Sequence, residues 1–123
     1  MPETDVVLYL DDNGSVPLRE WLLALPTKAA DKCLARLKRL EQLGHELRRP
    51  EADFLRDGIY ELRASYQGRQ YRMLYFFAGK QAVVVSHGLV KERAVPARDI
   101  DKAVERKKKY ELDPSSHTFR PER

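Results

Sequence analysis

Cationic side chains fall at matching positions on consecutive segments that read as strands. These strands are predicted at residues 59–66, 69–78 and 81–88, joined by turns at Gln67-Gly68 and Gly79-Lys80. If each turn holds two residues, Arg63 lies opposite Arg72, and Arg72 lies opposite His87. Like charges directly opposite each other on a sheet cost about 0.2 to 1 kcal/mol per pair. Residues that are kept at such a cost in stability are typical of a functional site. A row of cations predicts that this site binds phosphate.

Three further cations flank this row. Lys91 and Arg93 follow the third strand, and Arg69 opens the second. Arginines on the open face of an antiparallel sheet are also common as simply solvated side chains, so a structural interpretation of the row stands beside the functional one. A register slip of one residue would move every side chain to the opposite face and dissolve the row.

The elements that must position these strands follow from hydrophobic periodicity and from Pro and Gly punctuation. We expect a strand at 6–10, a helix at 17–25, a longer helix from 26 to about 43, a strand or turn at 52–56, and a helix that starts near Pro96. Because almost nothing separates the first two helices, they are predicted to form a helical hairpin on one face of the sheet. The predicted fold is therefore α+β: an antiparallel sheet, built from the three-stranded meander and the N-terminal strand, packed against a helical hairpin, with a C-terminal helix.

The chain of 123 residues suits one domain, which we place at residues 1–112. Residues 113–123 are polar and poor in core side chains, so we expect a disordered tail. No apolar run approaches the length of a membrane span, and the N-terminus is acidic and unlike a signal peptide, which predicts a cytoplasmic protein with no membrane partner.

Signals for a cofactor or a metal are absent from the sequence. It contains no glycine-rich nucleotide motif and no zinc-protease motif, and its three histidines, His45, His87 and His117, fall in separate segments. His45 is better explained as a surface or helix-capping residue, and the single cysteine, Cys33, as a small buried side chain. We predict neither a metal nor a cofactor.

Net charge gives a general indication of the partner. The formal charge is +4 at pH 7, and most of the positive excess lies after residue 58. This distribution favours a polyanion such as nucleic acid. Four consecutive cations at 106–109 fit either a nucleic-acid contact or a solvated helix end whose charges complement the helix dipole.

Three short motifs carry a family resemblance. They are Gly58-Ile59-Tyr60-Glu61-Leu62-Arg63, Tyr71-Arg72-Met73-Leu74-Tyr75-Phe76 and His87-Gly88-Leu89-Val90-Lys91. Together with the element order, they make residues 5 to 111 resemble the RelE/HigB toxin superfamily, in particular its phage-derived, HigB-like branch. The resemblance implies a RelE-like fold and the toxin of a type II toxin-antitoxin pair, which enters the ribosome and cleaves mRNA without a metal. It also implies a cognate antitoxin, often a helix-turn-helix protein like HigA, and it leaves the oligomeric state open.

The resemblance also suggests roles for individual residues. Arg72 matches the arginine that acts at the scissile phosphate, and Arg63 matches a basic position on the preceding strand. We expect these two to stabilise charge on the phosphate, His87 to act as general acid or to orient the phosphate, and Glu61 to be the candidate base. The residues expected to bind RNA are Lys91, Arg93 and Arg69.

Some positions depart from the family pattern and keep other functions open. Glu61 stands where some members carry lysine, Glu92 interrupts the basic residues after the last strand, and Tyr110 lies too far along its helix to replace a late tyrosine. One alternative is a ParE-like poison of DNA gyrase. Another is an RNA-binding or antitoxin-binding module that has lost catalysis.

Overall fold

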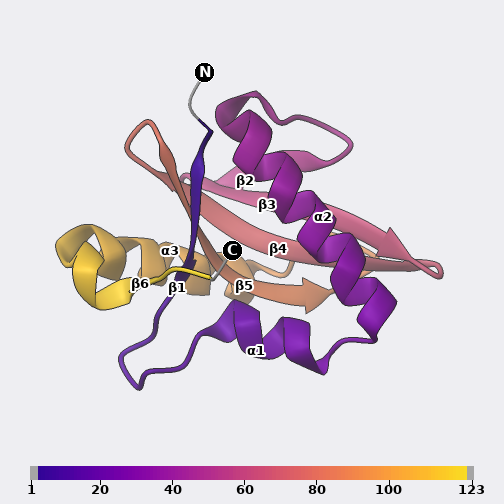
Figure 1. Ribbon diagram of the computed structural model, residues 1–123, viewed down its shortest axis with the longest axis horizontal. Helices are drawn as coiled ribbons and strands as arrows, with labels where there is room; N and C mark the ends of the chain where they lie inside the picture. Colours follow the sequence, from indigo (N-terminus) through magenta and orange to yellow (C-terminus); the bar gives the residue numbers. More distant parts are fainter. Residues whose placement is uncertain (1–2, 122–123) are drawn as a thin grey trace.

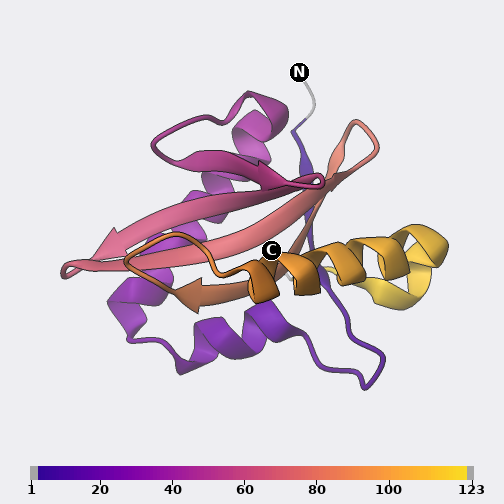
Figure 2. The ribbon, with the colours of Figure 1, turned by 180° about the vertical axis from the view of Figure 1, so that it is seen from behind.

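The computed structural model describes residues 3–121 and consists of a six-stranded sheet with helices on both faces (Figures 1 and 2). The strand order is β2-β3-β4-β5-β1-β6, with bounds β1 Asp5–Tyr9, β2 Ala52–Arg56, β3 Ile59–Tyr66, β4 Arg69–Ala78, β5 Ala82–Val90 and β6 Thr118–Phe119. The α-helices are α1 Pro17–Ala24, α2 Thr27–Leu43 and α3 Ala97–Leu112. Neighbouring strands are antiparallel except for β1 and β5, which are parallel. The expected α+β class is confirmed, and the architecture is consistent with a RelE-like fold.

The first hairpin of the meander has the predicted register. Tyr66 pairs with Arg69, and Arg63 pairs with Arg72. Gln67 and Gly68 both have positive φ, at 49° and 77°, as the two central residues of a type I′ turn require. Their sequence therefore fixes which side chains face each other across β3 and β4.

The register between β4 and β5 differs from the prediction. Arg72 lies opposite Leu89, and His87 lies opposite Leu74. Ala78 pairs with Ala82, so the turn holds three residues, and an irregularity beside Leu74 adds a further one-residue shift. Together the two shifts move the pairing by two residues. Because side chains alternate between the faces of a sheet, a shift of two leaves His87 on the predicted face, but it no longer lies opposite Arg72.

The two faces of the sheet carry separate cores. Helices α1 and α2 cover one face, where Leu18, Cys33 and Leu40 are buried with strand residues such as Leu62 and Met73 (Figure 1). Burial raises the pKa of the Cys33 thiol to about 11, in keeping with its expected place in the core.

Helix α3 crosses the other face, as Figure 2 shows. Its side chains Ile100 and Ala103 are buried there with Ile59, Phe76 and Val84 from the strands. The charged side chains Glu61, Arg63 and Arg72 of β3 and β4 lie on this same face, with exposures of 4%, 31% and 11%.

The expected disordered tail begins at residue 113, and the structure describes its part up to residue 121; residues 122–123 lie outside the described part. A 3-10 turn at Pro114–His117 leads into β6, which pairs with β1. The buried ring of His117 stacks on Tyr9 with 5.2 Å between centroids and a 5° interplanar angle, and His117 Nδ1 lies 2.9 Å from the Leu10 carbonyl oxygen. These contacts could not be predicted from composition, because they depend on two rings, His117 and Phe119, in an otherwise polar segment.

Candidate nucleic-acid interface

Five charged residues alternate in sign across β4, β3, the edge strand β2 and the loop before β2, in the order Arg72, Glu61, Arg63, Asp53, Arg49. We call this chain of ion pairs the charge ladder. Glu61 accepts hydrogen bonds from Arg72 Nη1 and, at 3.2 Å, from Arg63 Nε. Asp53 Oδ2 lies 3.3 Å from Arg63 Nη2 and 2.8 Å from Arg49 Nη2. The opposed arginines predicted from the register therefore meet through a carboxylate placed between them.

The inner members of the charge ladder are buried, and the outermost member is exposed. The side chain of Glu61 is 4% exposed and that of Arg72 11%, whereas Arg63 is 31% and Arg49 75% exposed. Arg72 is also held by its Nε, which donates to the Lys91 carbonyl oxygen at 3.0 Å. The inner end of the charge ladder is thus rigid and nearly dry, and its outer end reaches solvent.

The charge ladder holds three guanidiniums against two carboxylates. The hydrogen bond from Arg49 is the main cause that holds the pKa of Asp53 below its ordinary value, with smaller electrostatic support from Arg63. Each guanidinium carries five N–H donors, so Arg63 and Arg49 keep donors for another anion. Such a surface can bind a phosphate, provided that the phosphate competes with the internal carboxylates.

His87 belongs to a different hydrogen-bond chain. Its Nδ1 lies 2.8 Å from Ser86 Oγ, and its Nε2 lies 3.1 Å from Asp99 Oδ1 in the first turn of α3. Arg106 donates to Ser86 Oγ at 3.3 Å. The structure therefore brings Glu61, Arg63 and Arg72 together, but the hydrogen bonds of His87 join β5 to α3.

Burial is the main cause that lowers the pKa of His87, and its hydrogen bond to Asp99 opposes that effect. A neutral ring satisfies every partner: Ser86 Oγ donates to Nδ1, and Nε2 donates to Asp99. In this arrangement, the one N–H of the ring is already committed to α3.

The family follows from a comparison with known families. A model of the family described as Phage derived protein Gp49-like (DUF891) matches residues 20–108, which include part of α1, all of α2 and β2 to β5, and the charge ladder. The chain belongs to the Gp49-like family. A search of curated proteins found no match.

Lys91, Arg93 and Arg69, the residues expected to bind RNA, are all exposed in this Gp49-like protein. Lys91 is nearest to the charge ladder, because its carbonyl oxygen holds Arg72. Arg69 lies at the β3–β4 turn, and Arg93 lies in the loop before α3.

The structure adds Arg49 and Asp53, which sequence reasoning did not select. The signal for Asp53 lies in the pairing of β2 with β3, which sets it opposite Glu61. Without that register, Arg49 is only one of two adjacent arginines in a polar loop.

Of the four cations at 106–109, Arg106 and Lys109 attach α3 to other parts of the Gp49-like protein, and Lys107 pairs within the helix. Arg106 contacts Ser86 and lies 3.7 Å from Asp11, Lys109 bonds Asp12 at 2.9 Å, and Lys107 lies 3.3 Å from Glu111. Tyr110 makes an edge contact with Phe76 at 5.8 Å between centroids, which places its ring against the core. Of the two interpretations offered for this run, the structural one accounts for these contacts.

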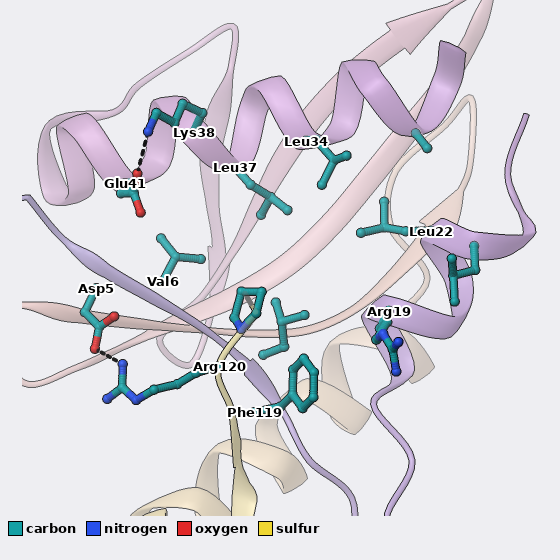
Figure 3. A pocket seen from close by; sticks show the side chains of 14 residues that line it. Asp5, Val6, Arg19, Leu22, Leu34, Leu37, Lys38, Glu41, Phe119 and Arg120 are labelled. Atoms are coloured by element: carbon teal, nitrogen blue, oxygen red, sulfur yellow. Dashed lines mark hydrogen bonds and ion pairs between the residues drawn. The ribbon is translucent and has the colours of Figure 1, made fainter. Parts of the chain in front are cut away.

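A groove of about 1180 Å³ lies on the opposite face, between α1, α2 and the end strands (Figure 3). Leu22, Leu34 and Leu37 point into it from the two helices, and Val6 and Phe119 line its other side. Ion pairs lie at its rim, between Asp5 and Arg120 and between Lys38 and Glu41. Its chemistry suits apolar side chains rather than phosphates.

Within residues 3–121, no helix is long and apolar enough to cross a membrane, and no three His, Cys, Asp or Glu side chains group to hold a metal.

Proposed function

We propose that this Gp49-like protein is the toxin of a type II toxin-antitoxin system and acts as a ribosome-dependent mRNA endonuclease that needs no metal. Three observations support the proposal: the family is associated with RelE/HigB-like toxins, the fold is consistent with RelE, and the sequence motifs resemble the HigB-like branch. The observation that carries it is the charge ladder, which holds a largely buried Arg72 and a more exposed Arg63 side by side on one carboxylate, Glu61.

The proposed chemistry is attack of an RNA 2′-hydroxyl on the adjacent phosphate. A 2′,3′-cyclic phosphate forms, the bond from phosphorus to the 5′-oxygen breaks, and the 5′-oxygen takes a proton from water. During the attack, negative charge grows on the non-bridging oxygens. Planar guanidiniums with fixed N–H donors stabilise that charge, and Arg72 is fixed on two sides by Glu61 and the Lys91 carbonyl. We assign Arg72 and Arg63 to the phosphate.

Glu61 remains the proposed base, and we propose that it becomes able to accept a proton only when the substrate is bound. Both of its oxygens accept hydrogen bonds from guanidiniums in the free protein. A phosphate that takes over some of those N–H donors would release a carboxylate oxygen next to the scissile bond, where it can accept the 2′-hydroxyl proton. His87, whose hydrogen bonds lead to α3, is assigned to positioning rather than to proton transfer.

The partners in this proposal are the ribosome with its mRNA, and a cognate antitoxin of the helix-turn-helix, HigA-like kind. Lys91, Arg93 and Arg69 supply exposed cations for RNA or ribosomal phosphates.

The test is induced expression in bacteria of the wild type, Arg72→Ala, Arg72→Lys and Arg39→Ala, with growth curves and mapping of mRNA 5′ ends. Arg39 is the matched control, since it is also an arginine paired with a carboxylate, Glu51, but it lies on α2. We expect cuts inside translated reading frames with the wild type and Arg39→Ala. Arg72→Ala should abolish them, and Arg72→Lys should reduce them strongly because an ammonium lacks the guanidinium fork.

Other outcomes select the alternatives. Growth arrest with DNA breaks and intact mRNA would replace the proposal with a ParE-like gyrase poison. RNA binding without arrest or cleavage would replace it with a binding module. Full cleavage by a folded Arg72→Ala variant would remove Arg72 from the mechanism.

A further inference from the structure

We propose that a pocket at the outer end of the charge ladder binds one nucleobase of the RNA whose phosphate lies at Arg72 and Arg63. This inference rests on the proposed function and names a substrate contact for it. The pocket, of about 560 Å³, lies between the loop at residues 45–49 and the edge strand β2. Its walls include Phe54, Tyr60 and two adjacent arginines, Arg48 and Arg49.

The aromatic wall is open and rigid. Phe54 is 53% exposed, so one side of its ring is open to a ligand. Its ring meets Tyr60 edge-on at 5.2 Å, and Tyr60 in turn stacks on the buried Tyr75 at 5.4 Å. Phe54 therefore stands on a fixed aromatic base, and an exposed ring of this kind can stack on any nucleobase.

The pocket is continuous with the charge ladder. Arg49 lines the pocket and shares the Asp53 carboxylate with Arg63. Phe54 pairs with Tyr60 and so lies on the other face of the sheet from Arg63 and Arg72. An RNA strand with one phosphate at the inner arginines can follow the charge ladder outward to Arg49 and pass around the edge strand β2, where a base meets Phe54. The line of cations and the aromatic wall thus form one path across the edge of the sheet.

The arginines of the pocket favour a base over an acidic peptide. Arg49 is paired with Asp53, and Arg48 donates to the backbone carbonyls of His45 and Leu47. An acidic peptide would depend on positive charge that is already partly neutralised. A base gains stacking on Phe54 without any charge, and its polar edge can still accept hydrogen bonds from the remaining N–H groups.

The experiment measures binding of a six-nucleotide single-stranded RNA to the full chain by fluorescence anisotropy, with 2′-O-methyl sugars so that the RNA cannot be cut. The variants are Phe54→Leu, which keeps apolar bulk, and Phe54→Trp, which keeps a stacking ring; thermal unfolding checks their folding. We expect Phe54→Leu to weaken binding about tenfold and Phe54→Trp to bind as tightly as the wild type. An RNA abasic at every position should bind the wild type more weakly and should lose sensitivity to Phe54→Leu.

The outcomes separate this inference from the proposed function. If Phe54→Leu binds RNA like the wild type while Arg72→Ala abolishes cleavage, the pocket does not bind a base, and the proposed nuclease function is supported. If Phe54→Leu weakens binding but Arg72→Ala still cleaves, the base site stands and the catalytic assignment falls. Binding of a poly-glutamate peptide that depends on Phe54, with RNA binding unaffected, would overturn the base site in favour of an acidic protein partner.

Discussion

Glu61 lies between two guanidiniums, so substitutions at this position are expected to destabilise the protein. Its side chain is 4% exposed, and removing one member of a buried ion pair typically costs about 3 to 5 kcal/mol, because the remaining charge stays buried without a partner. Arg72, at 11% exposure, would be left in that state. Replacement of Glu61 by an amide is therefore more informative than its deletion.

Glu61→Gln should lower the rate of RNA cleavage by about a hundredfold or more, since an amide cannot take the 2′-hydroxyl proton. RNA affinity should stay equal or rise, because the amide carbonyl competes less well for Arg72 and Arg63. The measurement is single-turnover cleavage on translating ribosomes, with affinity measured separately. Asp53→Asn is the control, since it makes the same chemical change in the outer part of the charge ladder; an equal rate loss in both variants would contradict a specific role for Glu61.

A second prediction concerns His87 and pH. Because burial lowers the pKa of His87 in the folded chain, the unfolded chain binds more protons once the pH falls below about 6.5. Folding stability should therefore decrease from pH 6.5 toward pH 5, as Arg106 and Lys102 add repulsion and Asp99 partly offsets it. Urea denaturation across this range should give a flatter pH profile for His87→Gln than for the wild type. Parallel profiles would show that His87 does not contribute to this dependence.

At the scale of elements, the contact of α1 with β5 depends on one glycine. Gly88 lies directly beneath the ring of Trp21, and a Cβ atom at this position would overlap that ring. Its role is to leave space for the helix rather than to permit an unusual backbone angle. Trp21 thus packs against the strand that also carries His87.

Gly88→Ala should destabilise the protein by about 1 to 3 kcal/mol, since α1 must move away from the sheet. Urea denaturation followed by circular dichroism gives the free energy of unfolding. A double-mutant cycle with Trp21→Leu provides the control: the smaller side chain should remove much of the penalty, so the two changes should not be additive. Additive losses would place the strain elsewhere.

These elements also show how far the sequence alone can lead. The Gln67-Gly68 turn set the β3–β4 register, so the pairing of Arg63 with Arg72 was predicted correctly. The three-residue turn at Gly79 and the irregularity beside Leu74 leave no mark in the hydrophobic pattern, so the position of His87 was wrong by two residues. To place Asp53 beside Glu61, the pairing of β2 with β3 must also be known, and no sequence motif predicts that pairing. The parts that could be predicted depend on local backbone chemistry, and the parts that could not depend on long-range register.

At the scale of the whole molecule, the C-terminal segment closes the sheet. β6 covers the outer edge of β1, with His117 stacked on Tyr9 and Phe119 packed on the helical core. A segment that contributes buried rings adds to the stability of the whole fold, whereas a disordered tail would not.

A chain that stops after Leu112 should therefore lose about 2 kcal/mol of unfolding free energy, because the rings of His117 and Phe119 no longer cover β1. Urea denaturation tests this. The control chain stops after Phe119 and loses only the exposed ion pair of Arg120 with Asp5, so it should stay within about 0.5 kcal/mol of the wild type. Equal stability of all three chains would favour the disorder expected from composition.

The parallel pairing of β1 with β5 also has a consequence for the order in which the strands fold. Val7 pairs with Val84, so β1 can form this pairing only with a strand that lies far along the chain. The meander at residues 59–90 consists of local hairpins and can form early, because closing short loops costs little entropy. We infer that β1 docks after the meander has formed, and that β6, which pairs with β1, docks after it.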